Sequence, residues 1–349
     1  MTRSFLGHLI VLLALGILPV ALFAQDSPAG PRPTGELIDI GGYSLHVNVT
    51  GRGKPTVVLI SGAGDFSFDW GLVQPQISSF SRCVSYDRAG LAWSDLGPTP
   101  RTMKQEAFEL RSLLQKAGLK GPYVLVGHSI GGLIARTYAG LYPNDVAGMV
   151  LVDSTTEDTT LSYQGKIVRV RDSAKGATVP DVQTIRSSPP KPPTKADLEQ
   201  MEFNRKLFGA PKITPPFDKL SSDLQILRLW ALNNPKLSAK TDDYWPDELR
   251  AMHESRVREP FQLRNTPLVI LVGARTDATP PGMSAELWKQ LSDEKRKQKM
   301  ELANLSRNSK LIIAQNSGHH IQLDEPAVVV DAIRHVVEAV RSGKRLPAN

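Results

Sequence analysis

The chain has 349 residues, of which 41% are hydrophobic and 22% are charged, as in an ordinary globular protein with a large core. Lys and Arg exceed Asp and Glu by 42 to 35, but the basic residues are scattered along the chain. The densest basic run, 295–299, follows two acidic residues and contains no aromatic residue, which is typical of a solvated helix face. We therefore expect no nucleic-acid site. With Cys83 as its only cysteine, the chain has no intramolecular disulfide.

The N-terminal segment predicts export. Arg3 precedes an apolar run over 9–24, after which polar residues resume. This pattern is typical of a secretory signal peptide, so we expect residues 1–24 to be removed and the protein to be periplasmic or extracellular. The alternative is an uncleaved membrane anchor, because 5–24 could just span a bilayer. Pro19 and the weak flanking charge favour cleavage, which would leave no stable membrane insertion.

A Pro/Gly linker over 25–35 is followed by alternating strand and helix patterns. Apolar, β-branched runs predict strands, and helical spacing of apolar residues predicts helices. The predicted strands are 37–40, 43–49, 56–61, 83–86, 124–126 and 149–152, and the predicted helices are 103–117 and 133–142. This alternation implies an α/β fold with a mainly parallel sheet and helices on both faces. Residues 36–154 would form its first part.

The rhythm breaks between 155 and 265, where no run resembles a buried strand. A proline-rich stretch, 187–193, is flanked by short helical patterns at 197–208, 222–232 and 247–257. We expect a helical cap inserted into the sheet domain. The second part of the core, 266–349, would contain strands at 267–273 and 311–314, a polar helix-rich excursion at 282–307 and a final helix at 328–340.

The segment 122–132 is the most informative. It reads as a buried strand, a sharp turn with Ser129 at its apex and a helix that begins at once. Gly127, Ser129 and Gly131 form the pattern G-x-S-x-G, in which small residues allow strand and helix almost to touch. Such a turn lifts the serine hydroxyl above the sheet edge, so the pattern predicts that Ser129 is a nucleophile.

A serine hydroxyl needs a base, and the base needs an acid that orients it. Both are expected after the carboxyl ends of strands, where open α/β sheets bind their ligands. Asp277 and His319 each follow a predicted buried strand in this way. Two alternatives stay open, because Asp153 also follows a strand and His320 is adjacent to His319.

These motifs together resemble the α/β-hydrolase superfamily, in its serine-nucleophile branch with an inserted helical cap. The resemblance covers 36–340 except the cap, and it rests on Gly-His-Ser-Ile-Gly-Gly at 127–132, Tyr-Asp-Arg-Ala-Gly at 86–90, Val-Asp-Ser at 152–154, Gly-Ala-Arg-Thr-Asp at 273–277 and Gly-His at 318–319. It implies that Ser129 is the nucleophile, His319 the general base and acid, and Asp277 the orienting carboxylate, in the chain order expected of this fold.

The resemblance also implies an oxyanion hole made of two backbone N–H groups. One would come from Ile130, directly after the nucleophile. The other would come from Ala63, in the loop where the family usually carries His-Gly before the donor and this chain has Ser61-Gly62. Because the donor is a main-chain group, the change to serine should affect the rigidity of the loop more than the hole itself.

The expected function is that of an exported serine hydrolase that forms an acyl-enzyme, most simply a carboxylic ester hydrolase acting on a small molecule. Ser129 argues against the branches of the superfamily that use an Asp nucleophile, and no pattern indicates a cofactor or a metal. Trp70 and Trp230 are candidate pocket residues. The run 226–232 is apolar except for Arg228, so this helix should bury several faces against the sheet domain or a ligand with a modest apolar acyl group.

Two alternatives remain. A prolyl-type aminopeptidase could use the same scaffold, with carboxylates of the cap binding the substrate ammonium. The candidates are Glu199, Glu202, Asp242, Asp243, Asp247 and Glu248. A protein that keeps the fold but only binds a ligand is the other alternative.

Overall fold

The computed structural model describes residues 30–239 and 244–347. The predicted signal peptide, 1–24, and most of the predicted linker therefore lie outside the described residues. From Pro33 onward the chain belongs to one unit, and the description below concerns this unit. Within the described residues, no helix is both long enough and apolar enough to cross a membrane.

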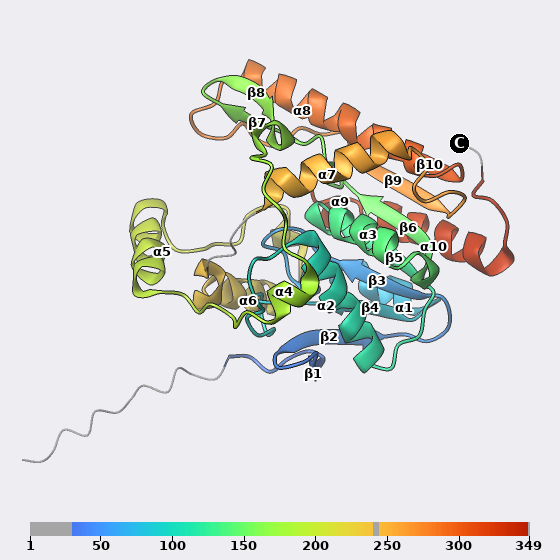
Figure 1. Ribbon diagram of the computed structural model, residues 1–349, viewed down its shortest axis with the longest axis horizontal. Helices are drawn as coiled ribbons and strands as arrows, with labels where there is room; N and C mark the ends of the chain where they lie inside the picture. The colour runs from blue at the N-terminus through green and yellow to red at the C-terminus, as the bar shows by residue number, and fades with distance from the viewer. Residues whose placement is uncertain (1–29, 240–243, 348–349) are drawn as a thin grey trace, which may run out of the picture. The chain divides into compact units, whose positions relative to one another are not determined.

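An eight-stranded sheet forms the centre of the unit (Figure 1). Its spatial order is β1-β2-β4-β3-β5-β6-β9-β10, with antiparallel pairing at β1–β2 and β2–β4 and parallel pairing elsewhere. The strands are β1 (Glu36–Asp39), β2 (Ser44–Thr50), β3 (Thr56–Ile60), β4 (Cys83–Tyr86), β5 (Tyr123–His128), β6 (Val146–Val152), β9 (Leu268–Gly273) and β10 (Ser309–Ala314). The predicted mainly parallel α/β sheet is confirmed. The hairpin β1–β2 turns at Gly41-Gly42, where the Asp39 side chain accepts the amide hydrogens of both glycines.

Both faces of the sheet are covered by helices, which explains the continuous apolar runs of the central strands. Alternate residues of β3 belong to different cores: Val58 and Ile60 face one, and Val57 and Leu59 face the other. The first core includes α2 (Met103–Lys116) and α3 (Ile130–Leu141), and the second includes α1 (Gln74–Ser78), α9 (Ile321–Asp324) and α10 (Pro326–Ser342). α10 buries one apolar face and begins with a proline, where no amide hydrogen is needed.

The insertion between β6 and β9 is mainly helical, with α4 (Val182–Arg186), α5 (Lys195–Phe208), α6 (Ser222–Leu232) and α7 (Trp245–Arg258). It also contains a short hairpin, β7 (Thr160–Tyr163) and β8 (Lys166–Arg169), that the sequence analysis did not predict. Its two turn residues, Gln164 and Gly165, both have positive φ, as a type I′ turn requires. The strands are largely exposed and Gln is an unusual first residue for this turn, so neither burial nor turn chemistry indicated it.

The helix α6 packs on the sheet domain, as expected, but two of its side chains depart from the apolar pattern. Arg228 is buried, whereas Ile226 is 63% exposed. Several apolar residues of α6 pack with Phe66, Phe68 and Trp93 of the sheet domain. Their contacts therefore dock the insertion on the domain.

A buried ion-pair network joins the insertion to α3. The Arg136 guanidinium donates two hydrogen bonds to Glu157, at 2.6 and 3.1 Å, and Arg256 of α7 pairs with the same carboxylate. Glu157 is fully buried, and although burial alone would raise its pKa, the two arginines lower it to about 2. The charge of the Glu157 carboxylate is therefore compensated by one arginine of α3 and one of α7.

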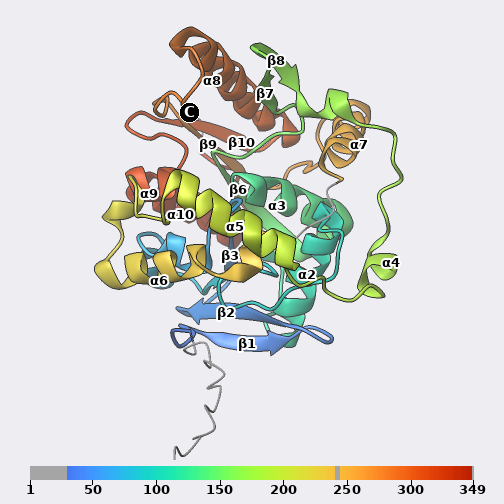
Figure 2. The ribbon, with the colours of Figure 1, turned by 90° about the vertical axis from the view of Figure 1, so that its left-hand side faces the viewer.

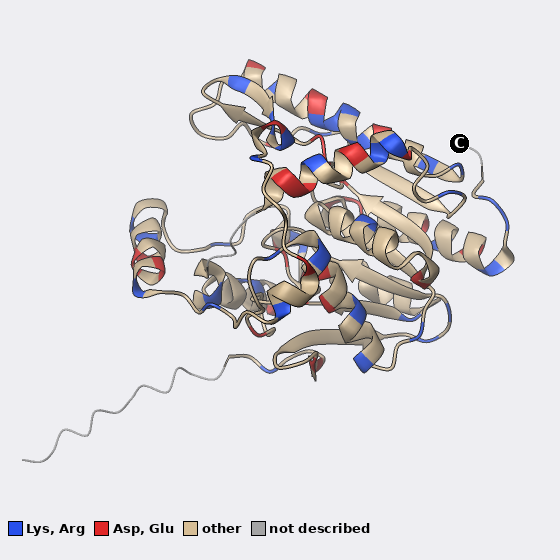
Figure 3. Cartoon of the chain, in the orientation of Figure 1, with Lys and Arg blue, Asp and Glu red and all other residues tan. Residues whose placement is uncertain are grey.

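The remaining long helix is α8 (Ala285–Met300), which lies beside the β7–β8 hairpin (Figures 1 and 2). Its C-terminal half carries Lys295, Arg296, Lys297 and Lys299. Figure 3 shows Lys and Arg in blue along this helix. Elsewhere the two signs of charge are interspersed.

Candidate active site

Ser129 lies at a strained turn between β5 and α3. Its φ of 53° and ψ of −124° are rare for a residue with a side chain. The flanking glycines are required by close approach: a Cβ on Gly127 would lie 2.5 Å from the carbonyl oxygen of Gly131, and one on Gly131 would lie 2.2 Å from that of Ile60. The turn therefore has the geometry predicted for a nucleophile elbow, with Ser129 lining a cavity.

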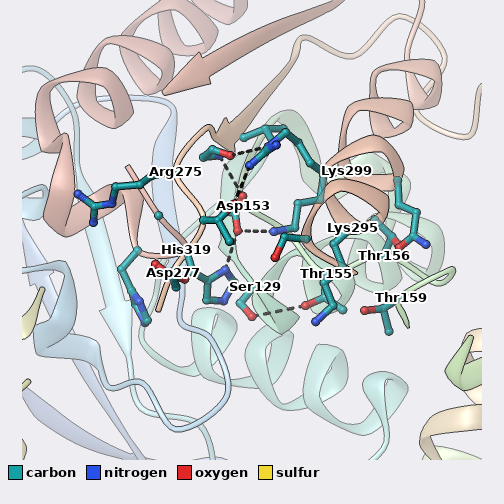
Figure 4. Close-up of a pocket in the computed structure, with 18 of the residues that line it drawn as sticks. Ser129, Asp153, Thr155, Thr156, Thr159, Arg275, Asp277, Lys295, Lys299 and His319 are labelled. Atoms are coloured by element: carbon teal, nitrogen blue, oxygen red, sulfur yellow. Dashed lines mark hydrogen bonds and ion pairs between the residues drawn. The ribbon is translucent and has the colours of Figure 1, made fainter. Parts of the chain in front are cut away.

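His319 lines the same cavity and contacts a carboxylate (Figure 4). Its Nδ1 lies 2.6 Å from Oδ2 of Asp153. Beside an ionised carboxylate, Nδ1 carries the proton, which leaves Nε2 free to accept another. Desolvation is the main cause that lowers the pKa of His319, to about 4, although the hydrogen bond to Asp153 opposes it. The imidazole is therefore neutral at neutral pH.

Asp153, at the end of β6, is held by contacts on both sides of its carboxylate. Oδ1 accepts the amide hydrogen of Gly273, at 3.1 Å, and Oδ2 accepts from His319 and from Lys299. Burial alone would raise the pKa of Asp153, but Lys299 and His319 outweigh it and hold that pKa well below its usual range. The carboxylate is thus ionised and fixed in orientation.

Asp277, which the sequence analysis expected beside the histidine, occupies a different place. It is exposed at the cavity rim, and its carboxylate lies so close to Gly318 that a Cβ there would be 2.1 Å from Oδ1. Among the contacts of the described residues, none joins the Asp277 carboxylate to His319. The expected pairing is therefore corrected: the structure brings the alternative, Asp153, to His319.

The sequence could not show which of the two acids pairs with His319, because both follow neighbouring strands of the sheet. Asp153 follows β6 and Asp277 follows β9, which are neighbouring parallel strands. Their carboxyl ends open at the same edge, so both acids reach the same cavity. Only the direction of the imidazole, together with Lys299 from α8, distinguishes them.

The serine hydroxyl has a partner of its own. Oγ of Ser129 lies 3.4 Å from Oγ1 of Thr155, and within the described contacts no hydrogen bond joins it to His319. Hydrogen bonds between nucleophile and base are often long or misaligned without substrate and tighten when it binds.

The loop expected to complete the oxyanion hole is braced against the nucleophile. Ser61 accepts a hydrogen bond from Nε1 of Trp70, at 3.0 Å, and donates one to the carbonyl of Phe66, at 3.1 Å. A Cβ on Gly62 would lie 3.1 Å from Cβ of Ser129. Ala63 thus follows a glycine in contact with the nucleophile, and Ile130 begins α3, where the first amide hydrogens have no partner in the helix.

His320, the alternative base, belongs to a second cluster. Its Nε2 lies 3.7 Å from Oδ1 of Asp65, whose Oδ2 lies 3.0 Å from Nδ1 of His128. Nε2 of His128 in turn donates to the backbone carbonyl of His319, at 3.0 Å. The cluster therefore supports the loop that carries His319, and Asp65 is a residue that no sequence pattern indicated.

The same cluster has a donor set that metal ions use. Asp65, His128 and His320 offer three ligand atoms within 4.8 Å of one another. However, the buried guanidinium of Arg228 lies 3.6 Å from Oδ1 of Asp65 and also pairs with Asp69. Since this fixed positive charge already compensates the carboxylates, the cluster does not favour a second cation.

The cavity that contains Ser129 has a volume of about 400 Å³. It lies between the loops after β6, β9 and β10 and the C-terminal half of α8. In the described part of the chain, its lining includes neither Trp70 nor Trp230, contrary to expectation. Trp70 is buried against the oxyanion loop, and Trp230 packs on Trp93 with ring centroids 5.3 Å apart.

Solved structures with several activities share this fold. A thermophilic esterase from Thermogutta terrifontis is 19% identical, with a TM-score of 0.55 over 87% of this chain and 98% of that chain. A putative epoxide hydrolase from Pseudomonas aeruginosa is 16% identical, with a TM-score of 0.57 over 88% and 96%. At these identities the likeness establishes the fold alone.

Several curated proteins and one family model are similar to this chain in sequence. An AB hydrolase superfamily protein of Gibberella zeae is 25% identical over 82% of this chain and 88% of its own length. A probable transporter, efuK, of Hormonema carpetanum is 40% identical over 35% of this chain, which corresponds to only 19% of that protein. The model of the alpha/beta hydrolase family matches residues 57–332. The chain therefore belongs to the alpha/beta hydrolase family.

Proposed function

We propose that the protein is a serine hydrolase that cleaves carboxylic esters through an acyl-enzyme. The observation that carries this proposal is the presence of Ser129, on its strained turn, in one cavity with a neutral His319 that is oriented by Asp153. In this proposal Asp153 takes the role that the sequence analysis gave to Asp277.

The proposed reaction has two halves. Ser129 Oγ attacks the ester carbonyl while Nε2 of His319 takes its proton, and the imidazolium then protonates the leaving alkoxide. Asp153 stabilises the imidazolium, and the backbone N–H groups of Ala63 and Ile130 donate to the developing oxyanion. Water then attacks the acyl-enzyme with His319 again as base, and acid is released.

The charges of the cavity favour an ester over an aminoacyl substrate. Its lining contains only two carboxylates among the described residues, Asp153 and Asp277, and Asp153 is already paired. An aminopeptidase would need carboxylates to hold the substrate ammonium. None of the described cap acids named as candidates lines this cavity; Asp242 and Asp243 lie outside the described residues.

Labelling with a fluorophosphonate tests the nucleophile, and turnover of nitrophenyl esters tests the reaction. We expect native protein to be labelled and active, and Ser129→Ala to lose labelling and several orders of magnitude in kcat. Aminoacyl anilides serve as the contrasting substrates, and a preference for them would replace the esterase assignment. A native protein that is neither labelled nor active on either class would support the ligand-binding alternative.

We also propose that the protein is exported after cleavage near Gln25, on the strength of the apolar N-terminal run. Intact-mass measurement of the exported protein tests this. Retention of 5–24 would instead support a membrane anchor.

A further inference from the structure

The cavity that contains Ser129 is lined by more basic than acidic residues. Its lining includes four basic residues, Arg275, Lys295, Arg296 and Lys299, against the two carboxylates Asp153 and Asp277. Most of the basic residues are paired within the protein, and only an unpaired one is available to a ligand.

Three of the basic residues have partners. Lys299 pairs with Asp153, and Arg275 pairs with Asp324 at 3.0 Å. Arg296 pairs with Asp293 at 3.1 Å and donates hydrogen bonds to two backbone carbonyls, those of Gly273 and Ala274. These side chains therefore shape the cavity and support the loop after β9.

Lys295 differs from the other three. Among the described contacts its ammonium has no hydrogen bond and no ion pair, although the side chain is half-buried in the lining. Burial, together with the nearby charge of Lys299, lowers the pKa of Lys295. An ammonium that is partly removed from water without a partner is unfavourable, and an anion bound in the cavity would relieve this cost.

Polar groups surround the same part of the cavity. Thr155, Thr156 and Thr159 line it, and the buried hydroxyl of Thr156 has no hydrogen-bond partner among the described residues. Figure 4 shows Lys295 extending from α8 toward the side of the cavity where Ser129 and Thr155 lie. The cationic side chain and the proposed nucleophile thus face one ligand volume.

We propose that the ester cleaved by this protein carries a second, anionic group, a carboxylate, and that Lys295 is its counter-ion. This inference rests on the proposed function and specifies its substrate class. One uncompensated positive charge matches a monoanion, which favours a carboxylate over a phosphate monoester with close to two negative charges at pH 7. It replaces the expected preference for an ester with a modest apolar acyl group.

Binding to the Ser129→Ala protein tests the anion site without relying on turnover. The probes are monomethyl glutarate, which has both an ester and a carboxylate, and methyl valerate, its neutral counterpart, measured by titration calorimetry. We expect the monoanion to bind more tightly, and Lys295→Gln in this background to weaken its binding about 10- to 100-fold, the value of a hydrogen bond to a charged group. Lys297→Gln is the matched control, because Lys297 lies on the same helix but is exposed and outside the lining.

The result that overturns the inference is equal binding of the two probes, or equal binding of monomethyl glutarate by the Lys295 and Lys297 variants. Tighter binding of inorganic phosphate than of monomethyl glutarate would also overturn the carboxylate assignment. Failure of the proposed function would look different, since native protein would then turn over neither nitrophenyl valerate nor its glutarate analogue, whatever the calorimetry shows.

Discussion

Lys299 and His319 contact the same oxygen of Asp153. Nδ1 of His319 lies 2.6 Å from Oδ2, and the Lys299 ammonium pairs with that atom from α8. The ammonium keeps the carboxylate ionised, and its charge also lowers the pKa of His319. In the proposed mechanism Lys299 is a positioning residue, because its ammonium contacts Asp153 and influences His319 through that contact and through its charge.

Lys299→Met should change the pH profile. The acid limb of kcat/KM reports the free enzyme's essential base, so the wild-type limb should lie near pH 4, the value to which the pKa of His319 is lowered. Removal of the positive charge should raise that pKa and move the limb to higher pH. Lys297→Met is the control, and coincident profiles for the two variants would show that Lys299 does not influence the base.

Asp153→Asn should damage ester turnover far more than Asp277→Asn. The amide would leave the imidazole without a carboxylate to fix its tautomer, a loss on the order of 10⁴ in a well-studied protease. Asp277 is exposed at the rim, so its amide should retain most activity. The comparison of kcat for the two purified variants decides the assignment, and the opposite ranking would restore Asp277 as the acid.

His319→Ala should be as damaging to kcat as Ser129→Ala, because members of such a unit act together. His320→Ala should retain more activity, since His320 contacts Asp65 and Phe217 and lies outside the contact with Asp153. Steady-state turnover of a nitrophenyl ester gives kcat for each of the three variants. A greater loss at His320 would mean that the base has been assigned to the wrong residue of the pair.

Glu157→Gln should lower the free energy of unfolding by about 3 to 5 kcal/mol, because it leaves the buried Arg136 without its carboxylate. Arg256 would lose one of its two carboxylates and keep Asp158. Denaturant titration measures this, and Glu202→Gln, at an exposed pair on α5, is the control with a change below about 1 kcal/mol.

The contribution of Glu157 to the free energy of unfolding should decrease as the pH falls. The pKa of Glu157 is lowered from 4.5 to about 2 in the folded protein. Its contribution is therefore complete above the unfolded value and declines as the pH falls from about 4.5 toward 2. The stability difference between wild type and Glu157→Gln should narrow over this interval, and a constant difference would contradict the electrostatic explanation.

Local patterns determined most of the architecture. The buried runs of β3, β5 and β9 and the periodic apolar face of α10 each reflect which side chains must leave water, so they could be recognised one element at a time. The elbow at Ser129 could be recognised in the same way, because Gly127 and Gly131, which approach each other there, lie within four residues of the sequence. The contact of Gly131 with Ile60 of β3 joins distant parts of the chain.

The tertiary structure decided what depends on residues distant in the chain. Asp153 is distinguished from Asp277 by an ammonium 146 residues away, and the oxyanion loop is braced by Trp70, which sequence had placed in the pocket. The burial of Arg228 depends on Asp69, 159 residues away, which compensates its charge. Apolar periodicity reports how much surface each element must bury, but the pairing of charges depends on which elements meet, and no local pattern contains that information.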